Sequence, residues 1–169
     1  MTEATFQSEV LRFLRRNNNV GILKPKYLAN ITEFNDNWCY HPPDNDRLNK
    51  PCDIVGGFID RYGTFRPFSL ELKLAKSKRF QFCRIEESQH AHLALVSVLY
   101  PDNTWAALLI NFRYDTPGKK INKAYRIPYY VIKEMVKAGV KGMDISDAEK
   151  LGIECAITKV NKKIAWKLW

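Results

Sequence analysis

The stretch that decides the fold consists of CDIVGGFID at residues 52–60 and TFRPFSLELK at residues 64–73. Both halves are rich in β-branched and aromatic residues, and Arg61-Tyr62-Gly63 between them is a turn signal. The pattern predicts two antiparallel strands joined as a hairpin. If the hairpin turns in the middle of this signal, residues whose numbers sum to about 125 lie opposite each other, which places Asp53 across from Leu72.

Three charged side chains are expected to meet at one end of this hairpin. Glu71 and Lys73 are two apart on one strand and project from the same face, and the hairpin brings Asp53 beside both. Neighbouring carboxylates repel each other, and a shared cation such as Mg²⁺ or Mn²⁺ normally keeps them ionised. A divalent ion activates water and neutralises charge on a phosphodiester, while an ammonium group stabilises the transition state. The residues predict a catalytic centre for phosphodiester hydrolysis.

A structural interpretation of the same residues stays open. Glu71 and Lys73 would then form an ordinary exposed strand face and Asp53 would cap a turn, because the pattern E-x-K arises by chance in many proteins. The alternating stretch SLELKL at 69–74 instead predicts burial of one strand face. This burial, together with the hairpin partner at the right place, favours the catalytic interpretation.

The remaining segments predict helices and strands around the hairpin. Apolar residues at three- and four-residue spacing indicate helices over 5–17 and 86–99, and an apolar run at 105–112 indicates a buried central strand. A short strand is expected at 20–23. Residues 24–50, rich in Asn, Asp and Pro, predict a long loop or extended arm that serves as a contact surface. The order αβββαβ places the fold in the α/β class, with a mixed central sheet flanked by helices.

The chain of 169 residues is long enough for one domain and short for two. We expect a core at about residues 5–128, followed by a helical and hairpin extension at about 129–169. The elements expected from the end of the core onward are a turn at 116–118, a short strand at 125–127, a helix over 128–138 closed by Gly139, a short helix capped by Ser146 and Glu149, and a hairpin about Asn161.

The charge of the chain favours a polyanionic partner. Lys and Arg number 27 against 18 Asp and Glu, a formal net charge of +9, and the resulting positive potential makes nucleic acid the leading partner. A basic protein without such a partner is the alternative. Six basic residues flank the proposed centre in sequence and predict a groove for the DNA backbone: Lys24, Lys26, Lys76, Lys78, Arg79 and Arg84. We interpret His90 and His92 as structural or DNA-facing.

The cysteines indicate a reducing, cytoplasmic setting. The four are widely separated, form no CxxC pair and follow no signal peptide at the polar start of the chain. Cys39 with His41 could begin a zinc site, but a second ligand pair at regular spacing is missing, which favours structural thiols. No apolar run approaches the roughly 20 residues that span a bilayer, so no membrane partner is expected.

Pro51-x-Asp53 followed by Glu71-x-Lys73 resembles the motif of the PD-(D/E)xK nuclease superfamily, here with one residue inserted between the proline and the aspartate. Three further features are similar to those of RecU-type Holliday junction resolvases: Lys24-Pro25 after the first strand, Phe80 after the lysine-rich turn, and Ile85-x-x-x-Gln89-His90 at the second helix. The resemblance covers roughly residues 5–112. It implies a restriction-endonuclease-like core and a homodimer whose two centres cut opposed strands of a four-way DNA junction.

The resemblance also implies roles for single residues. Asp53 and Glu71 match the metal-binding carboxylates, Lys73 matches the transition-state lysine, and Gln89 matches a helix glutamine that approaches the metal. Glu9 occupies a helix-one position where many members carry a carboxylate. An unpaired amide on the apolar face of a helix costs free energy, so Gln89 must meet the metal shell or a backbone group.

Two other functions remain open. A restriction-like or homing endonuclease would use the same centre but read base edges in a linear duplex. A nucleic-acid-binding protein without catalysis would use only its basic face, and its acidic pair would be structural.

Overall fold

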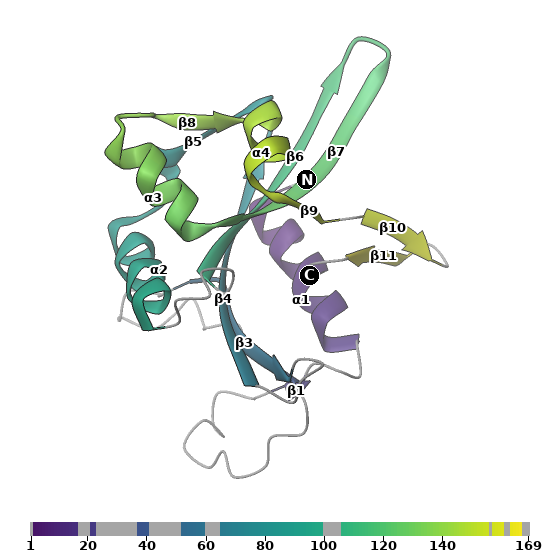
Figure 1. Cartoon of the computed structure of the whole chain (residues 1–169). Helices are drawn as coiled ribbons and strands as arrows, with labels where there is room; N and C mark the ends of the chain where they lie inside the picture. Colours follow the sequence, from purple (N-terminus) through teal and green to yellow (C-terminus); the bar gives the residue numbers. More distant parts are fainter. Residues whose placement is uncertain are drawn as a thin grey trace.

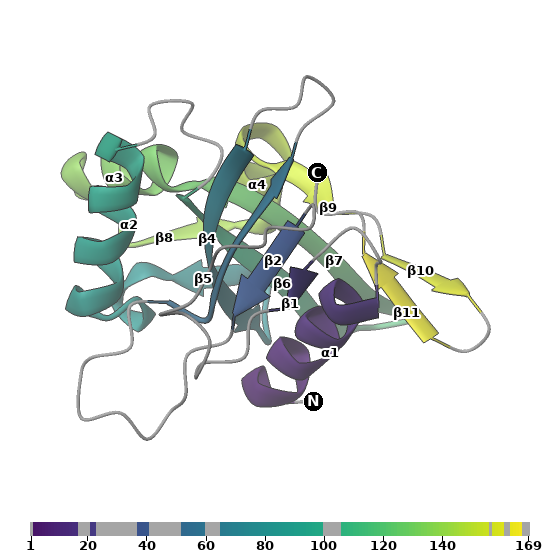
Figure 2. The same cartoon turned by 90° about the horizontal axis from the view of Figure 1, so that it is seen from below.

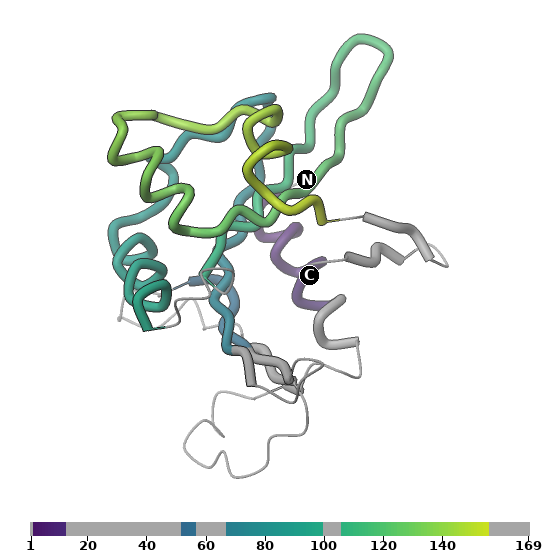
Figure 3. Tube along the Cα trace, in the orientation of Figure 1, coloured from purple at the N-terminus to yellow at the C-terminus, as the bar shows by residue number. Residues whose placement is uncertain are grey.

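The computed structural model describes residues 2–16, 21–22, 37–40, 52–59, 65–99, 106–155, 157–160 and 163–166, and nothing is inferred about the rest. Side chains are described for 2–12, 52–56, 67–99 and 106–155, the coloured parts of Figure 3. The predicted lysines Lys24 and Lys26 and the zinc alternative of Cys39 with His41 therefore lie outside the described side chains.

The core of the fold is a mixed sheet (Figure 1). Its strand order is β1-β2-β3-β4-β6-β7-β9, in which β4 and β6 are parallel and β3, β4 and β6, β7 form antiparallel hairpins. The strands are β1 (Gly21–Ile22), β2 (Asn37–Tyr40), β3 (Ile54–Ile59), β4 (Phe65–Ala75), β6 (Ala106–Thr116), β7 (Lys119–Pro128) and β9 (Ile153–Cys155).

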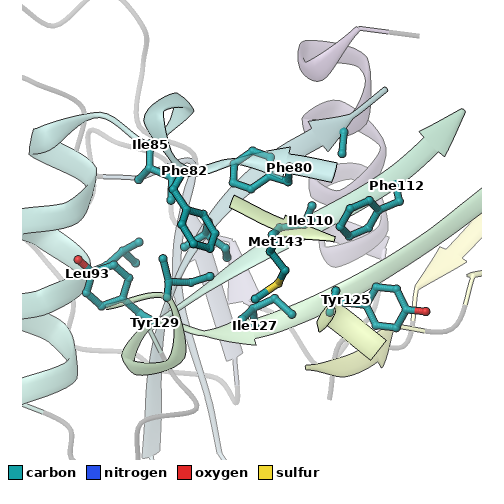
Figure 4. Packing of buried hydrophobic residues seen from close by; sticks show 14 of the residues in the cluster. Phe80, Phe82, Ile85, Leu93, Ile110, Phe112, Tyr125, Ile127, Tyr129 and Met143 are labelled. Atoms are coloured by element: carbon teal, nitrogen blue, oxygen red, sulfur yellow. The ribbon is translucent and has the colours of Figure 1, made fainter. Parts of the chain in front are cut away.

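Helices cover both faces of the sheet, as Figure 2 shows from below. On one face α1 (Glu3–Arg16) buries Phe6 and Val10 against the leucines of β4. On the other, α2 (Glu87–Leu99), α3 (Tyr129–Lys137) and α4 (Ile145–Leu151) cover a second cluster, which includes Leu93, Tyr129 and Ile110 (Figure 4). The predicted α/β class, a mixed central sheet flanked by helices, is confirmed.

The predicted hairpin of β3 and β4 is confirmed, but its predicted register is wrong by one residue. Paired residues sum to 124, as in Ile54 with Leu70, rather than 125. Opposite residues share a face of the sheet, and side chains alternate between faces. Continuing this register past the end of β3 brings Asp53 level with Glu71. The predicted register would have placed it with Leu72, on the face that α1 covers.

In the central sheet, strands β2 and β7 differ from the sequence prediction. Strand β2 lies inside the segment 24–50 that predicted a loop, and it pairs with β3. Strand β7 begins at Lys119, directly after the confirmed turn at Gly118, and not near Tyr125. Its first half, residues 119–123, contains a single apolar residue, Ile121, and no buried one, so it lacks the apolar pattern on which strand prediction depends.

The C-terminal part largely follows expectation. α3 is followed by Gly139 with a positive φ of 78°, and β10 (Ile157–Val160) pairs with β11 (Lys163–Trp166) as the predicted hairpin. The capping box of α4 consists of Asp144 and Asp147, not Ser146 and Glu149, because the helix starts earlier than predicted. A small unpredicted sheet of β5 (Arg79–Gln81) and β8 (Gly142–Asp144) joins the region after β4 to the C-terminal part. None of the described helices is long and apolar enough to cross a membrane.

Candidate active site

The candidate site lies where β3 leaves the edge of β4. Their pairing ends at Ile54, opposite Leu70, while β4 continues to Ala75. The backbone N–H of Leu72 therefore has no strand partner on that edge, and it donates instead to Oδ2 of Asp53 at 2.9 Å. The end of the shorter strand thus places the Asp53 carboxylate directly against β4.

Glu71 and Lys73 complete the predicted group of three charges. The ammonium nitrogen of Lys73 is 2.8 Å from Oε1 of Glu71. Both side chains point to the α2 face, since their partners across β6 are Leu108 and Ile110 of the cluster beneath that helix. Asp53, Glu71 and Lys73 are 2%, 0% and 5% exposed, so their charges interact in a medium of low polarity.

The pKa of Glu71 reflects this environment. The pKa of Glu71 is raised from 4.5 to about 8: burial raises it most, the nearby charge of Asp53 raises it as well, and Lys73 lowers it. A neutral carboxyl group is therefore favoured near neutral pH as long as no further positive charge reaches the site. A cation bound between the two carboxylates would restore their ionised form.

Gln89 positions Glu71. Its Nε2 donates to Oε1 of Glu71 at 2.7 Å, and its Oε1 accepts a hydrogen bond from the backbone N–H of Glu86 at 2.9 Å. The expectation that this buried amide must find partners is confirmed. The amide oxygen, which is the atom that could bind a cation, is already directed at the start of α2. In this arrangement Gln89 supports the carboxylate through its Nε2, and its expected approach to a metal stays a prediction.

Ser69 and His92 extend the site in a way that sequence reasoning missed. Ser69 lies two residues before Glu71 on the same face of β4, and its Oγ is 3.0 Å from Nε2 of His92. His92 is three residues after Gln89 on α2, so helix and strand spacing together bring both pairs into contact. This periodicity was the signal that could have revealed them. His90 instead meets the hydroxyl of Tyr129 at 2.9 Å and joins α2 to α3.

Cys52, next to Asp53, is not a nucleophile. Burial, and then the charges of Glu71 and Asp53, raise the pKa of its thiol to about 12. The thiol donates to the carbonyl of Ile54 at 3.4 Å. A protonated, fully buried thiol is inert, so hydrolysis at this site would require activated water.

The helix-one carboxylate beside the site is Glu3, and Glu9 lies elsewhere. Oε1 of Glu3 is 3.8 Å from Lys73 Nζ, whereas Oε2 of Glu9 is 3.7 Å from Arg113 Nη2 on β6. Six residues on a helix turn the side chain by about 240°, so the two glutamates cannot share a face. The catalytic role of Glu9 stays a prediction, but the carboxylate that α1 brings to Lys73 is Glu3, because the helix starts at Glu3, earlier than expected, and presents its first turn to the end of β4.

Two predicted DNA-binding arginines are engaged within the protein. Arg84 donates to Oε2 of Glu3 at 2.6 Å and to the carbonyl of Leu74 at 2.8 Å. Arg79 bridges to Asp144 at 3.1 Å and to the carbonyl of Gly142, joining β5 to β8. Both can still face a phosphate with their remaining donors. The predicted lysines Lys76 and Lys78 are exposed in the turn after β4.

The carboxylate oxygens of the site fit a hard divalent cation that takes few of its ligands from the protein. Among the described residues, no group of three or more His, Cys, Asp and Glu side chains could hold a metal ion, so the protein offers the pair Asp53 and Glu71. In the described part of the chain, no donor reaches the buried Oε2 of Glu71, which costs free energy unless a positive group meets it. Mg²⁺ commonly binds through one or two carboxylates, with waters and substrate phosphates in the remaining positions.

One solved structure gives a partial likeness. It is that of Hjc, a Holliday junction resolvase from the archaeal hyperthermophile Archaeoglobus fulgidus, with a TM-score of 0.40, 16% identity, and coverage of 70% of this chain and 83% of that chain. No family model and no curated protein matches this chain. At this TM-score and identity the likeness assigns no function. The functional interpretation therefore rests on the side chains of the site.

The stability of the metal-free protein is expected to fall as pH rises from about 4.5 to about 8. Between these values folded Glu71 keeps a proton that the unfolded chain has lost, so the stabilisation is complete below the unfolded pKa and is lost as pH rises through the folded pKa of about 8. Urea unfolding at several pH values measures this slope. Glu71→Gln should flatten it, and Mg²⁺ should stabilise the protein most at alkaline pH. An unchanged slope in the variant would contradict the assignment.

Proposed function

We propose that this protein is a divalent-metal-dependent DNA endonuclease that hydrolyses phosphodiester bonds, and that its substrate is branched DNA such as a four-way junction. The observation that carries the proposed chemistry is the state of Glu71. Glu71 is fully buried, one of its oxygens receives no donor from the described residues, its pKa is raised to about 8, and an ammonium group lies 2.8 Å from its other oxygen. Such a perturbed group with specific charged partners is typical of catalytic sites.

Each side chain has a distinct role in this proposal. Asp53 and Glu71 would hold Mg²⁺, or Mn²⁺ in its place, which supplies charge neutralisation and a lowered pKa of water when bound. The ammonium group of Lys73 stabilises the extra negative charge of the pentacovalent phosphorus. Gln89 holds Glu71 in place through its Nε2. In-line attack of water then leaves a 5′-phosphate and a 3′-hydroxyl.

The burial of the centre limits how DNA could reach it. Because the three charged side chains are at most 5% exposed, a phosphodiester reaches them only if a covering element moves. DNA binding and opening of the site are therefore coupled in this proposal. The net charge of +9 and the exposed Lys76 and Lys78 supply the attraction that could drive the coupling. The preference for junctions and the homodimer rest on the resemblance of the motif order.

The test is a cleavage assay on two substrates. A labelled four-way junction and a linear duplex of matched sequence are incubated with the purified protein, once with Mg²⁺ and once with EDTA. We expect Mg²⁺-dependent cleavage of the junction and little cleavage of the duplex. Cutting of one fixed linear sequence without junction preference would instead indicate a restriction-like or homing endonuclease. If neither substrate is cleaved, and Asp53→Ala and Glu71→Ala leave DNA binding intact, the protein is a nucleic-acid-binding protein without catalysis.

A further inference from the structure

The hairpin of β6 and β7 extends beyond the body of the molecule (Figure 1). The last buried residue of β6 is Phe112 and the first of β7 is Ala124, so residues 113–123, here called the arm, lie outside the core. The strands stay paired to Thr116 opposite Lys119. A two-stranded ribbon without apolar cover is marginally stable by itself, so core packing does not explain why the arm is there.

The base of the arm is braced against the body. Nε of Arg113 donates to Oδ1 of Asn122 on the opposite strand at 3.0 Å, and its Nη2 is 3.7 Å from Glu9 on α1. Lys123 forms a 3.0 Å ion pair with Glu149 on α4. Helices on both faces of the sheet thus hold the arm, which fixes the direction in which it projects.

The tip of the arm carries positive charge that the protein does not use. Residues 115–120 are all exposed, and they include Lys119 and Lys120. Within the described part of the chain, neither ammonium group has an ion-pair partner. Asp115 lies opposite Lys120 in the ladder and partly offsets its charge. The turn itself is closed by a 2.9 Å hydrogen bond from the hydroxyl of Thr116 to the carbonyl of Lys119.

The arm points along the strand direction that leads away from the candidate site. Lys73 pairs with Ile110, and the tip at Thr116 lies six residues further along β6. At about 3.3 Å per residue, this places the tip about 20 Å from the level of Lys73. The exposed Lys76 and Lys78 follow the end of β4, level with the base of the arm. These two exposed lysines therefore lie at a level between Lys73 and the tip.

We infer that the arm is a second DNA-binding element, which holds duplex DNA about six base pairs from the phosphodiester at the Asp53–Glu71–Lys73 centre. This inference rests on the proposed nuclease function. Duplex DNA advances about 3.4 Å per base pair, so six base pairs span the distance from centre to tip. A two-stranded β-ribbon fits the major groove, and lysines at its tip reach the flanking phosphates.

Binding of DNA in EDTA, where no cleavage occurs, tests the arm. Wild type is compared with Lys119→Ala/Lys120→Ala, with Asp115→Asn, and with a short-arm variant in which residues 114–121 are replaced by Asn-Gly. Each is titrated with fluorescent junctions whose duplex arms are about 20 or about 4 base pairs long. On long substrates the double lysine variant should bind roughly tenfold more weakly, with a salt slope smaller by about 2. Asp115→Asn should bind about twofold more tightly. The short-arm variant should lose at least as much DNA affinity as the double lysine variant.

The controls distinguish failure of the arm inference from failure of the nuclease proposal. Short substrates do not reach the tip, so all variants should bind and cleave them like wild type. Lys133→Ala/Lys150→Ala removes the same charge from α3 and α4 and should change long-substrate affinity less than the arm variant. If wild type binds and cleaves DNA but the arm variants match it on long substrates, the arm inference is overturned and the nuclease proposal stands. If wild type neither binds nor cleaves any DNA, both are overturned.

Discussion

Replacing Glu71 with glutamine is expected to reduce Mg²⁺-dependent cleavage by roughly 10³-fold or more while DNA binding persists. Glutamine has nearly the same shape and can still accept the 2.7 Å hydrogen bond from Gln89. It lacks the negative charge that, with Asp53, would hold the cation. The measurement is the single-turnover rate at saturating DNA, together with the affinity for DNA in EDTA.

Thermal unfolding separates this effect from loss of the fold. Because burial already favours neutral Glu71 in the metal-free protein, the variant should be at least as stable as wild type without Mg²⁺ and should gain less stability when Mg²⁺ is added. Glu154→Gln makes the same charge change at an exposed position on β9 and should leave the cleavage rate unchanged. A Glu71→Gln protein that cleaves at the wild-type rate would remove the proposed centre.

Lys73→Met is expected to lower the cleavage rate by about 10²- to 10³-fold, because the ammonium group can no longer stabilise the charge that develops on phosphorus. The change should also shift the pH–rate profile. Lys73 lowers the pKa of Glu71, so its removal raises that pKa and moves ionisation of Glu71, and with it metal binding, to higher pH. Single-turnover rates between about pH 6 and 9 measure both effects.

Two companion variants define what Lys73 contributes. Lys73→Arg keeps the charge in a larger, planar group, so it should recover part of the rate without restoring the wild-type geometry. Lys133→Met removes an exposed lysine on α3 and should leave the rate at saturating DNA unchanged. Breaking the buried pair with Glu71 also destabilises the protein, so rates are compared only for variants with native circular dichroism. An unchanged rate and pH profile in Lys73→Met would make the lysine purely structural.

The local pattern of residues was enough to predict the hairpin and its charged end. The β-branched runs around Arg61-Tyr62-Gly63 define two strands, and strand periodicity places Glu71 and Lys73 on one face. Helix periodicity likewise placed Gln89 on the buried face of α2. These features depend on neighbours a few residues apart, which is the range over which a sequence carries its own geometry.

The tertiary structure decided which groups meet across elements. The sequence predicted that Asp53 and Glu71 meet, but only the β3–β4 register, one residue away from the predicted one, put Asp53 on the face of Glu71. Only the packing of α1 against β4 selected Glu3 over Glu9, and only the length of the β6–β7 ladder produced the arm. The physical reason is that a one-residue shift in strand register, or a rotation of a helix about its axis, changes the local free energy little. It nevertheless changes which side chains face each other. The packing of the whole core therefore determines which arrangement forms.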